Sequence, residues 1–282
     1  MVIKMKSLVI TCSIVFLFVG SSAAQSWPSP ESLLMFLPFD STYELTDRAN
    51  DRIPFEVYNA KLETSKPGPF DIHNSSYTIS KDAGYICYYK PLPSFPSFTV
   101  SLYYYASGAS QTGAMVFAYG EGKANRFSFS YNGNALEVHR FDRFENFTSE
   151  HFTVENVFHN WTFVALTYDN NTETVKVYNE AGDKIHQKTN FPILDYEGMA
   201  FDIGFGRNNR TFLKMHSGDA IACTMIYTKV LSSEEIAQLP EVCRWKGNSP
   251  PATTTGNSAL STMFPTMSFI LLALSAYKML AM

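Results

Sequence analysis

The chain has 282 residues, enough for one large domain or two small ones. Aromatic residues make up 15% of the sequence and charged residues only 17%, a balance that favours β-structure and excludes coiled coil and intrinsic disorder. The net charge of −4 comes without a cluster of basic residues for a phosphate backbone, so we expect no nucleic-acid partner.

The first residues have the pattern of a secretory signal peptide. Lys4 and Lys6 precede an apolar stretch over 8–19, which is followed by small residues that suit signal peptidase. An uncleaved membrane anchor is the alternative, but the stretch is shorter than the roughly 20 residues that a spanning helix needs. We therefore predict a signal peptide over 1–24.

The C-terminal end is typical of a lipid-anchored surface protein. Residues 246–262 form a stalk rich in Pro, Thr and Ser, and a hydrophobic tail over 263–282 follows it. A transmembrane helix is the alternative, but Lys278 interrupts the tail and no basic cluster follows. We predict a GPI signal that attaches the protein to the outer face of the cell membrane. The candidates for lipid attachment are Gly256, Asn257 and Ser258.

Cysteine usage agrees with secretion. Cys12 lies in the predicted signal peptide, which leaves Cys87, Cys223 and Cys243. A bridge between Cys223 and Cys243 would contribute about 3 kcal/mol in the chain-entropy model, although the sequence does not choose among the three pairings. Cys87 would then be a free thiol or an intermolecular link. The spacing of cysteines and histidines does not fit a zinc site.

Five N-glycosylation sequons stand between the two ends, and in a secreted chain each marks a candidate surface position. Asn170 is the strongest candidate because it lies in a predicted hairpin turn. The sequons begin at Asn74, Asn146, Asn160, Asn170 and Asn209.

Several short segments alternate apolar and polar residues with period two, as half-buried strands do. Asn132-Gly133 adds a strong hairpin signal. Near the end, Ser232 and Glu235 form a capping box, which predicts a helix that Pro240 would stop. Strands of this length and spacing predict an all-β fold over 31–245, a two-sheet antiparallel jelly-roll sandwich with one short C-terminal helix. The predicted strands are 98–105, 126–131, 136–140, 162–168, 174–178, 201–205 and 220–227.

The order of these segments resembles the laminin G-like and pentraxin-like domains of the concanavalin A-like lectin and glucanase superfamily. The resemblance implies a jelly roll whose first and last strands pair. One departure is Ser101, where pentraxins commonly carry a cysteine. The matching segments are 34–40 (LMFLPFD), 98–102 (FTVSL), 159–169 (HNWTFVALTYD), 175–178 (VKVY), 201–204 (FDIG), 218–221 (GDAI) and 231–236 (LSSEEI).

The resemblance also raises the question of calcium, which takes six to eight oxygen ligands. The region that corresponds to the pentraxin site, 179–199, carries only scattered acids, among them Asp183. We expect no cofactor and leave calcium unassigned, because single acids at strand ends are more simply turn residues. The candidates for a laminin G-type calcium site are Asp40, Asp47, Asp169 and Asp219.

Catalysis is not expected. Glucanases of this fold use paired carboxylates in a Glu-x-Asp-x-x-Glu strand, and the nearest pair here, Asp195 and Glu197, lacks a third acid in register. His139 and His159 are interpreted as packing or surface residues, and Trp161 is expected in the core.

Core positions are also predicted for Phe127 and Phe129. Alternation along the strand sends Tyr104 to one face of the sheet and its neighbours Tyr103 and Tyr105 to the other.

These observations predict a non-catalytic cell-surface or secreted glycoprotein whose domain serves recognition or adhesion, with an extracellular glycan or protein as ligand. A structural component of the extracellular matrix, of the mineralised kind, is the alternative, although the sequence has no acid-rich run for mineral ions. A glycosidase-related enzyme is the third and most distant hypothesis.

Overall fold

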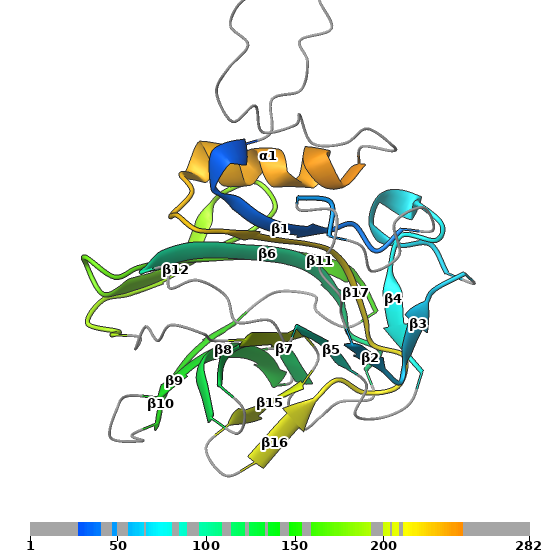
Figure 1. Cartoon of the computed structure of the whole chain (residues 1–282), viewed down its shortest axis with the longest axis horizontal. Helices are drawn as coiled ribbons and strands as arrows, with labels where there is room; N and C mark the ends of the chain where they lie inside the picture. Colours follow the sequence, from blue (N-terminus) through cyan, green and yellow to red (C-terminus); the bar gives the residue numbers. More distant parts are fainter. Residues whose placement is uncertain are drawn as a thin grey trace, which may run out of the picture.

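Two antiparallel sheets face each other in the computed structural model, and one helix covers the outer face of the larger sheet (Figure 1). The predicted signal peptide, stalk and hydrophobic tail lie outside the residues that the structure describes. The described residues are 28–40, 47–49, 56–64, 66–80, 85–88, 96–108, 114–121, 124–132, 135–141, 147–153, 159–192, 200–203, 205–208 and 211–244.

The larger sheet has eight strands, and it joins the start of the domain to its end. Its last strand, β17, pairs with β6 on one side and with both β4 and β1 on the other, so the first and last strands pair as expected. In spatial order the strands are β13 (Lys184–Lys188), β12 (Thr174–Tyr178), β11 (Trp161–Asp169), β6 (Ser97–Tyr105), β17 (Ala220–Tyr227), β4 (Tyr77–Ile79) and β3 (Ala60–Leu62), with β1 (Leu33–Leu37) against β17.

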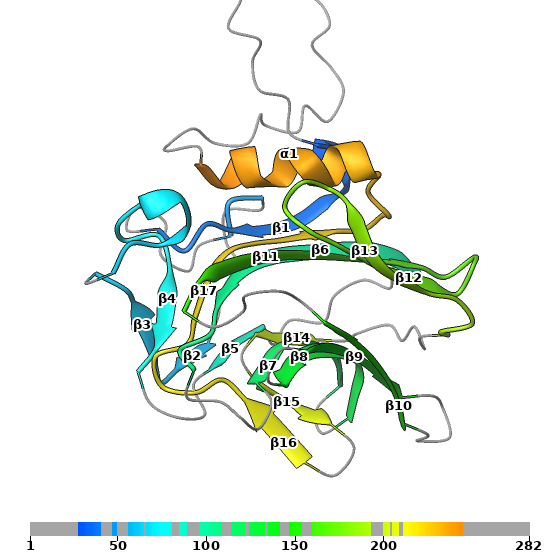
Figure 2. The ribbon, with the colours of Figure 1, turned by 180° about the vertical axis from the view of Figure 1, so that it is seen from behind.

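The smaller sheet has seven strands and lies beneath the first (Figure 2). The predicted Asn132-Gly133 hairpin is confirmed by the pairing of β8 with β9 on its two sides. A two-stranded sheet, β15 (Phe205–Asn208) with β16 (Thr211–Lys214), lies on the far side of it. The seven strands are, in order, β10 (Phe147–Thr153), β9 (Ala135–Phe141), β8 (Ala124–Asn132), β7 (Ala114–Glu121), β14 (Ala200–Ile203), β5 (Tyr85–Tyr88) and β2 (Glu56–Tyr58).

The main hydrophobic core fills the space between the two sheets. Phe98 of β6 packs edge-on against Phe127 of β8 with ring centroids 5.4 Å apart, and Phe129 is fully buried beside them. Tyr104 also points into this core, whereas Tyr103 belongs to a second cluster on the opposite face of the sheet. The predicted alternation of these two tyrosines, and the burial of both phenylalanines, are confirmed.

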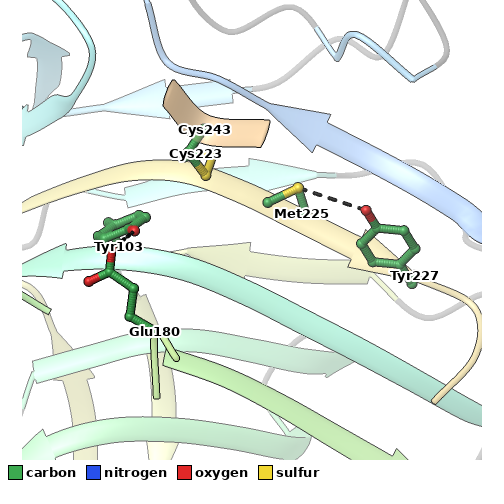
Figure 3. Close-up of a disulfide and its surroundings, with 6 residues drawn as sticks. All are labelled: Tyr103, Glu180, Cys223, Met225, Tyr227 and Cys243. Carbon is green, nitrogen blue, oxygen red and sulfur yellow. Dashed lines mark hydrogen bonds between the residues drawn. A yellow bond between two sulfur atoms is a disulfide. The ribbon is translucent and has the colours of Figure 1, made fainter. Parts of the chain in front are cut away.

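The second cluster lies between the larger sheet and the helix α1 (Ser233–Arg244). A disulfide between Cys223 of β17 and Cys243 of the helix closes this layer (Figure 3). Beside it, the Tyr103 hydroxyl donates a hydrogen bond to Oε1 of Glu180 at 2.9 Å. Burial, with the neighbouring Glu180 carboxylate, raises the pKa of Tyr103, so this hydroxyl stays protonated.

The helix begins as predicted but does not end where expected. Ser232 and Glu235 make the reciprocal capping bonds, from the Ser232 amide to Glu235 Oε2 at 2.8 Å and from the Glu235 amide to Ser232 Oγ at 3.2 Å. The prediction that Pro240 stops the helix is wrong, because the helix continues to Arg244. Leu239 and Val242 are buried against the sheet, and this packing outweighs the helix-propensity cost of about 3 kcal/mol for an interior proline.

Among the described residues, no helix is long and apolar enough to cross a membrane.

Candidate functional site

A pocket opens on the outer face of the larger sheet, beside β3 and β4. Figures 1 and 2 show these two strands at one edge of that sheet. Its floor is a straight row of four residues that stand opposite one another on neighbouring strands: Trp161 faces Tyr105, Tyr105 faces Ala220, and Ala220 faces Thr78. Directly opposed residues of antiparallel strands share one face of the sheet. The small side chain of Ala220 therefore leaves room between two aromatic rings and a hydroxyl.

The aromatic half of the floor is held in place by its neighbours. The rings of Tyr105 and Trp161 pack with centroids 5.5 Å apart and a tilt of 53°, and the Trp161 indole Nε1 donates to the carbonyl oxygen of Pro67 at 3.2 Å. The ammonium of Lys66 lies 5.7 Å from the centre of the Tyr105 ring, within reach of a cation–π interaction. Trp161 is half-buried and packs against the second hydrophobic cluster, so the predicted core packing is confirmed in part, and the residue also lines the pocket.

The connection between β3 and β4 forms one wall of the pocket. Gly68 sits so close to Ser75 that a Cβ atom there would come within 2.2 Å of the Ser75 hydroxyl oxygen. The Gly68 amide donates to the carbonyl of Ile72 at 2.8 Å, which closes the loop. A glycine at this position is what allows the loop to fold tightly beside the sheet. His159 and Gly218 line the pocket as well.

The polar half of the pocket contains a buried hydroxyl without a protein partner. Ser76 is fully buried, and its Oγ makes no hydrogen bond within the described structure. Beside it, the Thr78 hydroxyl donates to Oε2 of the buried Glu63 at 2.8 Å. A buried polar atom without a partner costs free energy, which a ligand hydroxyl or amide would recover by hydrogen bonding to it.

The pocket has a volume of about 260 Å³, near the lower limit of about 300 Å³ for sites that bind drug-sized ligands. Its size suits one or two small rings rather than an extended chain. An aromatic wall opposite hydroxyl and carboxylate groups can bind a ring that is apolar on one face and carries hydroxyls at its edge. The chemistry is therefore that of a site for a small polyhydroxylated ligand.

The predicted glycosylation sites fall in different places. Asn160 is exposed at the start of β11, Asn170 is exposed in the β11–β12 turn, and Asn74 is partly buried with a left-handed backbone (φ 56°). Asn146 and Asn209 lie outside the described residues. The lipid-attachment candidates at 256–258, and the pair Asp195 and Glu197, also lie outside them.

Three of the aspartates considered as calcium ligands, Asp47, Asp169 and Asp219, accept hydrogen bonds from different parts of the chain. Asp47 and Asp219 are buried rather than solvated, and each accepts hydrogen bonds from backbone amides: Asp47 from Phe36 at 2.8 Å, and Asp219 from Ser107 and His216, both at 2.9 Å. Asp169 caps its own turn. Within the part of the chain that the structure describes, no three His, Cys, Asp or Glu side chains form a group that could hold a metal ion.

The two histidines weighed as bases differ in their surroundings. His159 is exposed and lines the pocket. His139 is fully buried in the smaller sheet, where its Nε2 lies 2.7 Å from Ser130 Oγ and 3.4 Å from Glu137 Oε2. Burial, together with the charge of His151, lowers the pKa of His139 to about 4, so its ring is neutral at physiological pH.

Comparison with known families decides the class of the domain. Residues 81–237, more than half of the chain, match a laminin G-type family model described as the concanavalin A-like lectin/glucanases superfamily. The chain belongs to this superfamily. The concanavalin A-like assignment confirms both the resemblance and the fold predicted from the sequence, and the superfamily includes both lectins and glucanases. A search of curated proteins finds no match to the sequence.

Solved structures of botulinum neurotoxin binding domains share this concanavalin A-like fold. The receptor-binding domain of serotype D is 16% identical with a TM-score of 0.58, and the match covers 76% of this chain and 53% of that one. The serotype D ligand-binding domain in complex with N-acetylneuraminic acid is also 16% identical, with a TM-score of 0.59 and coverage of 76% and 51%. The serotype G binding domain is 12% identical, with a TM-score of 0.58 and coverage of 74% and 51%. The chain spans about half the length of these structures.

Sequence reasoning did not find the pocket. It weighed the tyrosines as sugar-stacking candidates and left open which of them are exposed. The floor combines residues from four strands that are far apart in the sequence, and only the registers of β11, β6, β17 and β4 bring them into one row. The one local signal was the alternation that separates Tyr105 from Tyr104.

Proposed function

We propose that this concanavalin A-like domain is a non-catalytic recognition module that binds a small glycan determinant, one or two sugar rings, in the pocket above Tyr105 and Trp161. The observation that carries the proposal is the pairing of this aromatic wall with the buried hydroxyl of Ser76, which has no partner in the described structure. The sugar ring would stack on the aromatic side, and one of its hydroxyls would hydrogen-bond to Ser76 Oγ once a rotation of the Ser76 side chain brings this buried atom to the pocket surface.

Two further observations support binding of a glycan. The superfamily includes lectins, and one solved structure of the same fold is a ligand-binding domain in complex with N-acetylneuraminic acid. Binding rather than hydrolysis is proposed because Glu63, a carboxylate of the pocket, is buried and accepts the Thr78 hydroxyl, and because the glucanase strand pattern is missing from the sequence. The full-length protein should therefore leave β-glucan, lactose and chitobiose intact.

The test uses purified full-length protein on a biosensor, with 3′-sialyllactose, lactose, chitobiose and maltose as probes. Ser76→Ala also removes the Asn74 sequon, so its affinity is compared with that of Asn74→Gln, which removes the same sequon and keeps the Ser76 hydroxyl. Relative to Asn74→Gln, Ser76→Ala should weaken binding of the recognised sugar about 5- to 30-fold, the equivalent of one lost hydrogen bond of about 1–2 kcal/mol. Because Ser76 Oγ has no protein partner, the free energy of unfolding should change little.

Ser101→Ala is the matched control. Ser101 is also fully buried with an unpartnered Oγ, but it stands opposite Ala165 and Met225 in the cluster beneath α1. This variant should bind the sugar as well as the unmodified protein does. Equal sugar affinities of the Ser76→Ala and Ser101→Ala variants would reject the pocket as a glycan site. The pocket would also be rejected if Trp161→Ala abolished the binding of none of the probes.

We also propose that the module is displayed on the extracellular face of the cell membrane by a lipid anchor. The support is the sequence of the two ends: a predicted signal peptide over 1–24, then a stalk over 246–262 with small residues at 256–258, followed by an apolar tail that Lys278 interrupts. Phosphatidylinositol-specific phospholipase should release the protein from intact cells. A mature form that stays bound and yields a peptide containing Lys278 would show a spanning helix instead.

A further inference from the structure

Two of the predicted N-glycosylation sequons border the pocket. Asn160 stands between His159 and Trp161, and both of these neighbours line the pocket. The sequon at Asn74 has Ser76 as its hydroxyl residue, on the opposite wall. Consecutive Cα atoms are about 3.8 Å apart, so a sugar attached to Asn160 starts at the rim of the pocket.

The third sequon among the described residues, at Asn170, lies far from the pocket. Asn160 precedes the first residue of β11 and Asn170 follows its last, so the whole strand separates them. At about 3.3 Å per residue, ten residues of strand place the two asparagines roughly 30 Å apart. Both asparagines are exposed, which makes Asn170 a natural reference for any effect of a glycan at Asn160.

Resting on the proposed function of the pocket, we propose that an N-glycan on Asn160 restricts access to it, so that occupancy of this sequon regulates ligand binding. An N-glycan is bulky and hydrophilic, and a chain of several sugars is larger than a pocket of about 260 Å³. Its attachment point beside Trp161 lets it cover the aromatic wall, and a large ligand is then excluded more strongly than a free disaccharide.

Lys66 provides a readout that needs no ligand. Its side chain is exposed and lines the pocket over the Tyr105 ring, so its reaction with a bulky amine-reactive polyethylene glycol ester reports access to this wall. Lys184 is exposed on β13, at the opposite edge of the same sheet, and serves as the internal reference. Labelling of both lysines is quantified by mass spectrometry on the full-length glycoprotein.

The experiment compares the unmodified chain with Asn160→Gln and Asn170→Gln. Glycopeptide analysis should find Asn160 occupied, and Asn160→Gln should raise the labelling of Lys66 relative to Lys184 by about threefold or more, the equivalent of about 0.7 kcal/mol in access. Asn170→Gln should leave this ratio unchanged. The same Asn160→Gln variant should bind polymer-linked forms of the recognised sugar more tightly, with a smaller gain for the free sugar.

The two proposals fail in different ways. An unoccupied Asn160, or equal Lys66 labelling in the two variants, overturns the role of the Asn160 glycan whatever the pocket binds. If Asn160→Gln opens the pocket to the reagent but no sugar binding depends on Trp161 or Ser76, then the glycan covers the pocket and the proposed function is wrong.

Discussion

Cys223 and Cys243 form a disulfide that ties the last turn of α1 to the middle of β17. The bond closes a loop with a sequence separation of 20, and this loop contains the whole helix up to Cys243. The C-terminal turn of the helix is thereby fixed on the sheet beside Tyr103, where Arg244 also lies 4.3 Å from the centre of the Phe70 ring.

Replacing both cysteines by alanine should lower the free energy of unfolding by about 3 kcal/mol, because the unfolded chain regains the entropy of an open loop. Denaturant unfolding of the double variant and of the reduced unmodified protein should give the same loss. The core between the sheets contains neither cysteine, so near-native circular dichroism is expected below the transition. An unchanged unfolding midpoint would show that the disulfide does not stabilise the fold.

The capping box of α1 gives a second, smaller prediction. Ser232→Ala removes the acceptor for the Glu235 amide and should cost about 1 kcal/mol of stability. Glu235 also contacts Lys229 Nζ at 3.0 Å, and so it remains partly held in the variant. Gln238→Ala, at an exposed position of the same helix, is the control and should change the unfolding midpoint by much less. Equal effects of the two substitutions would contradict the role of the cap.

The pKa of His139 predicts how stability depends on pH. Its folded pKa of about 4 lies below the unfolded value of about 6.5, so the unfolded chain takes up the proton first as the pH falls. The neutral ring therefore contributes stability above about pH 6.5, and this contribution is lost between about pH 6.5 and 4. From pH 7 to pH 5 the loss should be about 2 kcal/mol.

His139→Gln should remove this part of the pH dependence, because glutamine does not titrate. The exposed His73 is the control, and His73→Gln should keep the slope of the unmodified protein. Urea unfolding at pH 7, 6 and 5 measures all three proteins. If the slope survives in His139→Gln, another group causes it.

The fold could be predicted from the sequence because its strongest signals are local. Period-two alternation located β6 and β8, short runs of strand-forming residues between turns located β11, β12 and β17, and the resemblance placed them in one jelly roll. The end of α1 was missed, because Pro240 breaks a helix only when packing does not compensate, and the burial of Val242 depends on a sheet that is distant in the sequence.

The candidate site could not be predicted for a related reason. Trp161 looks like a core residue in its own strand. Its half-buried position follows from its place as the first residue of β11, in register with Tyr105, the last residue of β6, beside the pocket. Ser76 carries no local signal at all, since its lack of a partner depends on how the β3–β4 connection folds over it. Local patterns give faces of strands, whereas a pocket needs the registers between strands.

The last prediction concerns Asp219, the buried carboxylate at the start of β17, between the pocket residues Gly218 and Ala220. Each of its oxygens accepts a backbone amide: Oδ1 accepts Ser107 N and Oδ2 accepts His216 N, both at 2.9 Å. In Asp219→Asn, either orientation of the new amide sets an NH₂ group against one of these N–H donors. The variant should therefore lose about 2–3 kcal/mol of stability and bind the sugar more weakly.

Asp169→Asn is the matched control for this prediction. Asp169 accepts the Asn171 amide through Oδ1 at 3.0 Å and the Thr172 hydroxyl through Oδ2 at 3.0 Å, in an exposed turn. A hydroxyl can reverse its role and accept from the new NH₂ group, so this substitution should cost less than about 1 kcal/mol. Thermal and urea unfolding of both variants, followed by sugar binding on the biosensor, makes the comparison. If Asp219→Asn is as stable as Asp169→Asn, the buried carboxylate does not hold this edge of the pocket together, and its hydrogen bonds are replaced by water.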